Sequence, residues 1–499
     1  MKLINKTLLL LLVITSFVSC NSYLDVNDDP NNPVSDLVSP DLILPAAQNG
    51  CASIMQGADT RLVNFGNVMM NQWAGDVTNF TSGNSDEYVF NMTNTFYSSI
   101  WDRIYIATDK LQAIINKDSD KYRNFTAIAR ILKAHNLQYI VDLYGDAPYS
   151  EAFQRGQNYQ PKYDKDSDIY MGLYDELTQA INDIHNTTLE TVNPGSSDVM
   201  LGGDMVMWEK FANTLRLKLL VRASSSSDAD VQSWVNSKFP ELASVSFLGA
   251  GETISNNPGY FVNQGNQSPF WDVFVKPNGD PTQMKKFTVG SAYFINYLKG
   301  IETPTAPYDN RISAYFTNPP YQGIEQGADD PANPNQDLSF VGPGLLRGAD
   351  QDAWFFTSSE SFFLQAQAVL GGYLPGNAQT LFESAITESF NLLNLSADAA
   401  PYISSIAGIP GVGWTNNNTD DLKAIMLQKW VALHSIDPTD AFIDYNRTGY
   451  PNPPLPLTAT DSHRPYRLVY PLSEYTGNSV NVPNLTRADL FVPSIFWQQ

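Results

Sequence analysis

Hydrophobic residues recur at intervals of three and four along much of the chain, the period of an α-helix with one buried face. The first two such runs are Ile104, Ala107, Leu111 and Ile114, followed by Ile128, Ile131, Leu132, His135 and Tyr139. Together they predict a hairpin of two antiparallel helices. Residues 173–184 and 211–219 repeat the pattern on either side of a Pro194-Gly195 turn, and predict a second hairpin.

A third helical pair is predicted after residue 356. Thr357 and Glu360 have the spacing of a capping box at a helix N-terminus, and apolar residues at helical spacing follow them. Gly371-Gly372 is expected to end this helix, because glycine is a poor helix former. The apolar positions over 381–390 predict its partner.

A further helix is expected over 422–433, behind Thr419, Asp420 and Asp421, since acidic side chains favour a helix N-terminus. Helical pairs that cannot bury their apolar faces alone must stack on one another, as in tetratricopeptide-type scaffolds. The sequence therefore predicts a mainly α fold with a helical scaffold over about 40–222 and 357–446.

The helical period is lost between residues 223 and 356 and again over 447–499. Turn-forming stretches such as NNPG at 256–259 and PNGDP at 277–281 interrupt the first of these segments and leave room only for short helices. Irregular loops on a rigid frame often carry binding residues. We therefore expect the ligand-binding region over about 223–356.

The N-terminus has the features of a lipoprotein export signal. Lys2 and Lys6 precede an apolar stretch over 8–18, and FVSC at 17–20 resembles a lipobox that ends at Cys20. The apolar stretch is shorter than the roughly 20 residues that span a bilayer, which disfavours a membrane helix; an ordinary signal peptide stays the alternative. The prediction is a signal peptide over 1–19 and a mature domain over 20–499 with lipid on Cys20.

Charge and composition limit the classes of ligand that the protein can bind. The formal net charge is −22 in 499 residues, which disfavours nucleic acid as a partner. Cys51 is the second of two cysteines, so neither a structural disulfide nor a cysteine metal site is expected. The 9 Trp, 25 Tyr and 26 Phe, with many Asn and Gln, suit a neutral, hydroxyl-rich ligand that stacks on rings and hydrogen-bonds to amides.

Motifs for catalysis or metal binding are not found. Asp164, Asp166 and Asp168 have the spacing that opens a calcium loop, but Ile169 stands where the turn needs glycine, so a solvated helix start is expected instead. The four histidines lack the spacing of a zinc site, and no rule selects an acid pair for glycoside hydrolysis. We expect a protein without cofactor, metal or enzymatic activity; an exported glycosidase is kept as an alternative.

Several further motifs, in order, resemble the SusD/RagB family of nutrient-binding outer-membrane lipoproteins. They are NDDPNNP (27–33), DLYGDAPY (142–149), WEKFANTLRLK (208–218), YDNRI (308–312), SES (359–361), QKWVAL (428–433), DYNRTGYP (444–451) and RLVYP (467–471). The resemblance spans nearly the whole mature chain, and its N-terminal motif is similar to the branch described as starch-binding and associated with the outer membrane.

The resemblance implies a frame of four tetratricopeptide-like helical pairs, a surface location at the outer membrane and a SusC-like TonB-dependent transporter as partner. It implies capture of an oligosaccharide, while a peptide-binding member of the family is the nearest alternative. Ligand contacts in the family come from aromatic residues on variable loops, which no motif transfers residue by residue. The candidate ligand-binding residues are Trp73, Asn79, Phe80, Trp271 and Tyr321.

Overall fold

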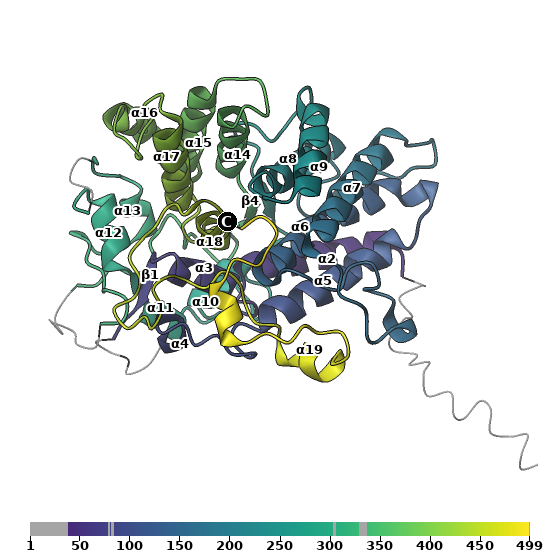
Figure 1. Ribbon diagram of the computed structural model, residues 1–499, viewed down its shortest axis with the longest axis horizontal. Coiled ribbons are helices and arrows are strands. Elements are labelled where there is room, and N and C mark those ends of the chain that lie inside the picture. The colour runs from purple at the N-terminus through teal and green to yellow at the C-terminus, as the bar shows by residue number, and fades with distance from the viewer. Residues whose placement is uncertain (1–37, 78–79, 81–83, 303–305, 329–336, 499) are drawn as a thin grey trace, which may run out of the picture.

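The computed structural model describes residues 38–77, 80, 84–302, 306–328 and 337–498 (Figure 1). The predicted signal peptide, Cys20 and Asn79 lie outside these residues. The helices before residue 240 are α2 (Pro40–Gln56), α3 (Leu62–Met69), α4 (Ser85–Tyr88), α5 (Ser99–Ile115), α6 (Arg123–Tyr144), α7 (Asp166–His185), α8 (Met205–Ala223) and α9 (Ala229–Lys238). Short 3-10 helices are η2 (Asp120–Tyr122), η3 (Arg155–Gln157), η4 (Gly195–Ser197), η5 (Phe239–Leu242) and η6 (Arg487–Phe491).

The segment over 223–356, which lacks a helical period in the sequence, begins with the ten-residue α9, which the sequence did not indicate, and then holds only short helices. They are α10 (Pro269–Phe274), α11 (Gln283–Phe287), α12 (Ala292–Leu298) and α13 (Ile312–Tyr315). Longer helices resume with α14 (Ser358–Leu370), α15 (Ala378–Leu392), α16 (Ser396–Ile406), α17 (Asn418–Ala432) and α18 (Pro438–Thr448), and α19 (Leu472–Gly477) lies near the C-terminus.

Helices that follow one another in the sequence pack side by side (Figure 1). α5 packs on α6, α6 on α7, and α7 on α8, which gives the two hairpins that the apolar period predicts. α14 packs on α15 and α17 and also on α8, and α18 packs on α3, so the two helical regions join at more than one place. The prediction of a mainly α-helical fold is confirmed.

The start of α14 differs from the predicted capping box. The Thr357 side chain accepts a hydrogen bond from the Glu360 N–H at 3.1 Å, as an N-cap should. The Glu360 carboxylate, however, does not reach back to the backbone but accepts from Lys218 Nζ at 2.7 Å. Only half of the box forms, because a buried ammonium on α8 attracts this carboxylate more strongly than a backbone N–H.

The region before α17 contains a helix that the sequence pattern did not indicate. This helix, α16, carries Pro401 in its interior and many small residues, and its buried face consists only of Ala399, Tyr402 and Ile406. α17 itself begins at Asn418, earlier than predicted, because the Asn417 side chain caps it by accepting from two backbone N–H groups. Asp420 and Asp421 then lie in its first turn, where acidic side chains are favourable.

The expected solvated start of α7 is wrong for Asp166, which is 4% exposed. Its carboxylate accepts from the backbone N–H groups of Ser167 and Phe496, at 2.7 and 2.8 Å. Burial raises the pKa of Asp166 to about 6. The reason is the C-terminal segment, which crosses the helical scaffold and covers this site; Trp497 is fully buried there.

Two small antiparallel sheets fasten the loop-rich segment to the helices. β1 (Trp73–Gly75) pairs with β3 (Thr288–Gly290), with Trp73 opposite Gly290. β2 (Ile254–Asn256) pairs with β4 (Ala353–Phe356), with an irregularity in register at Ile254/Ser255. Each strand is too short to show an alternating pattern, so the sequence did not predict them.

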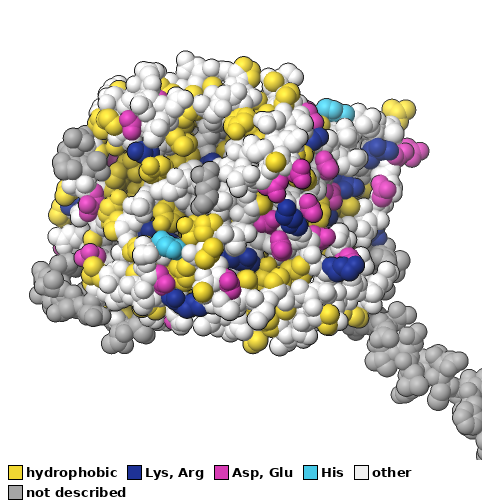
Figure 2. Space-filling view, viewed as in Figure 1, with side chains coloured by type: hydrophobic (Ala, Val, Ile, Leu, Met, Phe, Trp, Pro, Cys, Tyr) yellow, Lys and Arg dark blue, Asp and Glu magenta, His cyan; other side chains and the backbone are white. Residues whose placement is uncertain are grey.

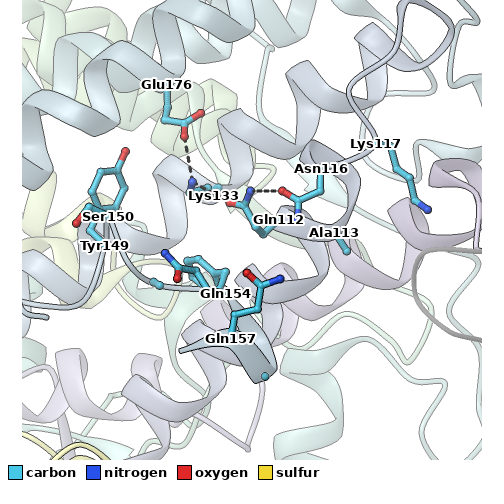
Figure 3. Close-up of a pocket in the computed structure, with 13 residues that line it drawn as sticks. Gln112, Ala113, Asn116, Lys117, Lys133, Tyr149, Ser150, Gln154, Gln157 and Glu176 are labelled. Atoms are coloured by element: carbon cyan, nitrogen blue, oxygen red, sulfur yellow. Dashed lines mark hydrogen bonds and ion pairs between the residues drawn. The ribbon is translucent and has the colours of Figure 1, made fainter. Parts of the chain in front are cut away.

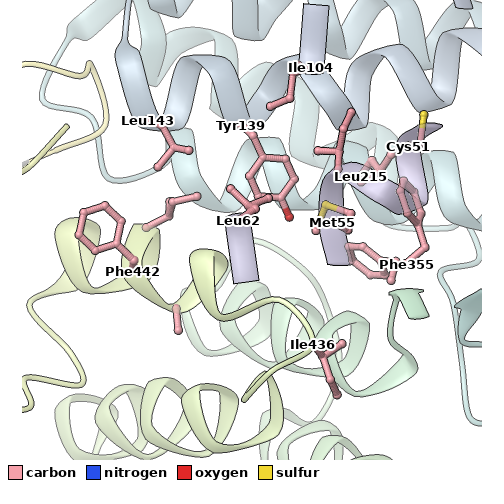
Figure 4. Packing of buried hydrophobic residues seen from close by; sticks show 14 of the residues in the cluster. Cys51, Met55, Leu62, Ile104, Tyr139, Leu143, Leu215, Phe355, Ile436 and Phe442 are labelled. Carbon is pink, nitrogen blue, oxygen red and sulfur yellow. The ribbon is translucent and has the colours of Figure 1, made fainter. Parts of the chain in front are cut away.

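One large core connects helices from both ends of the chain (Figure 4). Met55 of α2, Tyr139 of α6, Leu215 of α8, Phe355 of β4 and Phe442 of α18 all belong to it. A second cluster lies among α14, α15, α16 and α17. None of the helices in the described part is both long and apolar enough to cross a membrane.

Buried ion pairs join the same helices from within. The members are Lys218 and Arg222 on α8, Lys429 on α17, Arg447, Asp440 and Asp444 on α18, Asp142 on α6, Glu360 on α14, and Asp437 before α18. All of them are less than one-tenth exposed. On the outer face shown in Figure 2, charged side chains of both signs gather around α6 and α7.

Candidate functional site

A hollow of about 220 Å³, which we call the aromatic pocket, lies between the α2–α3 connection and the short helices α10 and α11. Its apolar lining includes Trp73, Phe270, Phe274, Val273 and Met284, and its polar lining includes Gln56, Asn64 and Arg61. The pocket thus brings residues that precede the first hairpin together with residues of the loop-rich segment.

Trp73 fixes one wall of the aromatic pocket. The β1–β3 pairing holds its backbone, and its ring packs edge-to-face on Phe274 with ring centroids 5.9 Å apart. The Trp73 side chain is 2% exposed, and its indole N–H has no hydrogen-bond partner among the described residues. A buried donor without a partner costs about 1–3 kcal/mol, so a ligand oxygen that reached this N–H would bind favourably.

A second hollow of about 330 Å³, the polar pocket, adjoins the first. Its lining includes Asn84, Ser85, Asp86, Glu87, Thr95 and Tyr97. Arg61 lines both pockets, and its guanidinium lies 5.1 Å from the centre of the Tyr97 ring. The polar pocket is within the size range of small-molecule sites, roughly 300–1,000 Å³.

A chain of hydrogen bonds holds the boundary between the two pockets. Asn64 Nδ2 donates to the Tyr97 hydroxyl, which donates to Glu87 Oε1 at 2.7 Å. Burial, with the adjacent Glu87 carboxylate, raises the pKa of Tyr97 well above its usual value, so the phenol stays protonated. These groups are therefore fixed in place before any ligand arrives.

Chemically, the combined site offers apolar faces next to hydrogen-bonding groups. Aromatic and methionine side chains can contact the C–H faces of a sugar ring, and the amide, hydroxyl and carboxylate groups of the polar pocket can bind its hydroxyls. Arg61 adds a planar set of donors at the junction. The arrangement fits an uncharged, hydroxyl-rich ligand.

The four described candidate residues do not form one arc. Trp73 lines the aromatic pocket, and Phe80 lies nearby through an edge-to-face contact with Phe287, whose ring covers Gly75 of β1. Trp271 lies on α10, half-buried against the main core. Tyr321 lies beside α12, where its carbonyl oxygen accepts from Lys299 Nζ at 3.1 Å. Their part in ligand binding stays a prediction.

Sequence reasoning missed most of the lining residues. Phe270 and Phe274 are four residues apart, a spacing that places them on one face of α10 and could have suggested a short amphipathic helix. Arg61 has a left-handed backbone (φ 56°) in a connection without any motif, and Tyr97 precedes the first hairpin. Nothing local in the sequence marks these two residues.

One group of carboxylates in the described part has the geometry of a metal site: Glu360, Asp437 and Asp440, whose oxygens lie within 4.8 Å of one another. The Lys218 ammonium lies among them, 2.7 Å from Glu360 and 2.9 Å from Asp440. A lysine already supplies the positive charge that a cation would bring, so these residues fit an ion-pair network better than a metal site.

The comparisons with known proteins agree with this fold. Residues 32–471 match the sequence model of the SusD-like family that is described as starch-binding and associating with the outer membrane. A search of curated proteins gives no match.

Solved structures of similar fold come from several bacteria. A chitin-binding SusD homologue from Flavobacterium johnsoniae has a TM-score of 0.70 and 22% identity, covering 88% of this chain and 94% of that chain. A SusD homologue from Bacteroides uniformis also has a TM-score of 0.70 and 22% identity, covering 92% of this chain and 99% of that chain. A SusD-like protein from Bacteroides thetaiotaomicron has a TM-score of 0.70 and 20% identity, covering 88% of this chain and 94% of that chain.

Proposed function

This chain belongs to the SusD-like family described as starch-binding and associating with the outer membrane, and from that premise we propose that it captures an oligosaccharide at the cell surface. It then passes the ligand to a SusC-like TonB-dependent transporter, as the family resemblance implies. The lipid on Cys20 anchors the protein to the outer membrane.

The observation that carries this proposal is the junction of the aromatic and polar pockets at Arg61. A glycan needs both kinds of surface at once, because each sugar ring has apolar C–H faces and a rim of hydroxyls. A cationic peptide side chain could pair with Asp86 and Glu87 in the polar pocket, but it offers no flat apolar face to the aromatic pocket, whereas a sugar ring can contact both pockets. The site therefore favours a neutral glycan over the peptide alternative.

The proposed role is binding without hydrolysis. Glycoside hydrolysis requires two carboxyl groups on opposite sides of a scissile bond. In the polar pocket, Glu87 accepts from the Tyr97 hydroxyl and Asp86 from Asn91 Nδ2 at 2.9 Å, which are positioning contacts for binding. Incubation with a bound oligosaccharide should leave its chain length unchanged; turnover that disappears when Glu87 is replaced by Gln would favour the glycosidase alternative.

The binding test uses soluble mature protein without Cys20, titrated calorimetrically with maltoheptaose and, separately, with chitohexaose. Ala58 is exposed and lines the aromatic pocket, so Ala58→Trp should fill its entrance without disturbing the core. We expect this variant and Arg61→Ala to weaken binding about tenfold or more, since loss of a good contact costs about 1.4 kcal/mol or more. Trp271→Ala tests the other predicted ring in the same way.

The matched control is Ala397→Trp, which adds the same ring at an exposed position of α16. It should bind like the wild type, and all variants should keep the wild-type melting temperature. Wild-type protein that binds neither sugar at millimolar concentration would refute glycan capture. Normal binding by Ala58→Trp would show that the glycan binds elsewhere.

A further inference from the structure

A larger hollow, of about 850 Å³, lies in the helical scaffold and shares no lining residue with the aromatic and polar pockets. It is enclosed by the end of α5, by α6 and α7, and by the segment 149–157 that follows α6 (Figure 3). We call it the amide hollow. Its volume is near the upper end of the range typical of ligand sites.

Four carboxamide side chains face this hollow from opposite walls. Gln112 and Asn116 come from the end of α5, and Gln154 and Gln157 come from the segment opposite, with their side chains directed toward the same space (Figure 3). Gln112 Nε2 donates to Asn116 Oδ1 at 2.8 Å, which orients the first pair. Each carboxamide carries both donors and acceptors, so the four together suit a ligand with many hydroxyl groups.

The floor of the hollow is charged but internally neutralised. Lys133 Nζ donates to Gln112 Oε1 and to Glu176 Oε1, both at 3.0 Å, and Lys133 is only 7% exposed. The ammonium also lies 5.5 Å from the centre of the Tyr149 ring. Glu176 also pairs with Arg130, which in turn pairs with Asp183 at 3.3 Å, so the two cations and two carboxylates at the floor balance one another.

Two aromatic residues are held rigidly at the side of the hollow. Tyr149 packs against Gly172 of α7, where a Cβ atom would lie only 2.7 Å from the ring. Phe153 has a left-handed backbone (φ 62°), which is rare for a bulky residue, and its ring contacts Tyr105 with centroids 5.8 Å apart. Strained backbone of this kind is often found at binding sites.

We propose that the amide hollow is a second binding site, for an uncharged, hydroxyl-rich ligand such as an oligosaccharide segment. Amides on two walls supply hydrogen bonds, Tyr149 and Phe153 supply ring surface, and the Lys133–Glu176 pair at the floor is already neutralised. The inference goes beyond the proposed function, since it adds a site on the helical scaffold, away from the loop-rich segment.

The test uses the Ala58→Trp protein, in which the aromatic pocket is filled, titrated with the same two oligosaccharides. Gln154 and Gln157 are exposed, and no structural contact depends on their side chains in the described part of the chain, so Gln154→Ala/Gln157→Ala should not affect folding. Added to Ala58→Trp, this change should weaken the remaining binding about tenfold or more. Ala113→Trp, which fills the hollow from the α5 wall, should act in the same way.

The control for the double change is Gln379→Ala at an exposed position of α15, which should leave binding unchanged. If wild-type protein binds sugar and Ala58→Trp does not, the amide hollow is no glycan site and this inference is overturned while the proposed function stands. If Gln154→Ala/Gln157→Ala alone abolishes all binding, the hollow is supported and the aromatic pocket loses its proposed role. Binding unaffected by either hollow variant overturns the inference.

Discussion

Asp440 pairs with three cations of the buried ion-pair network, and its replacement tests how the helical scaffold is held together. Its carboxylate accepts from Lys218 Nζ at 2.9 Å, from Lys429 Nζ at 2.5 Å and from Arg222. Asp440 is fully buried. The substitution Asp440→Asn keeps the size of the side chain but removes the negative charge that three buried cations share.

The expected loss of stability follows from what remains around those cations. Lys218 still has Glu360 at 2.7 Å, Lys429 still has Asp444 at 2.7 Å, and Arg222 still pairs with Asp142. Removing one partner of a buried ion pair typically costs about 3–5 kcal/mol. Because each cation keeps one carboxylate, we expect the lower end, about 3 kcal/mol, which is a large part of a typical free energy of unfolding.

The measurement is urea unfolding at neutral pH, followed by far-ultraviolet circular dichroism. The matched control is Asp461→Asn, which breaks a surface pair with the half-exposed Arg487 and should cost less than about 1 kcal/mol. If Asp440→Asn lowers the free energy of unfolding no more than Asp461→Asn, the network does not hold the helices together and the reasoning is refuted.

Two further predictions concern the anchor and the response to pH. Replacing Cys20 by Ala should leave the protein unprocessed or release it from membranes, and wild-type membrane association of this variant in cells without the transporter would contradict lipid anchoring. Burial raises the pKa of Asp437 from 3.8 to about 6, although Lys218 opposes the shift. Between about pH 4 and pH 6 the folded protein therefore keeps a proton on Asp437 that the unfolded chain has lost. The contribution of Asp437 to the free energy of unfolding falls as the pH rises through this range. Asp437→Asn removes this pH-dependent loss of stability, so the urea midpoint of the variant should rise relative to that of the wild type between about pH 4 and pH 6. A difference in midpoint that stays constant with pH would contradict the raised pKa of Asp437.

The helices that the sequence predicts are those whose apolar residues repeat over several turns. α5 and α6 have such a face, so their existence and pairing follow from local pattern alone. α8 was predicted from a few apolar positions, yet most of its polar residues are buried as well. Lys218 and Arg222 can be buried only because acidic residues of α6, α14 and α18 form ion pairs with them. These partners are distant in the sequence, so no local pattern predicts the pairs.

The candidate site, too, depends on contacts between distant segments that a local pattern does not predict. Trp73 could be singled out as an aromatic residue before the first hairpin, but its neighbours Phe270, Phe274 and Met284 lie far along the chain. They come together through the β1–β3 pairing, whose three-residue strands are too short to be recognised in a sequence. Composition predicts the chemistry of the ligand, whereas tertiary contacts decide which residues line the two pockets.

Cys51 makes the protein convenient for site-specific labelling. Its side chain is fully buried in α2, Asn136 Nδ2 lies 3.4 Å from Sγ, and burial raises the pKa of the thiol to about 12. A thiol that is both enclosed and protonated reacts slowly with maleimides and oxidants. In soluble protein that begins after Cys20, a single cysteine introduced at an exposed position would therefore take up a fluorophore selectively, and the emission of that fluorophore could follow ligand binding without prior removal of the native cysteine.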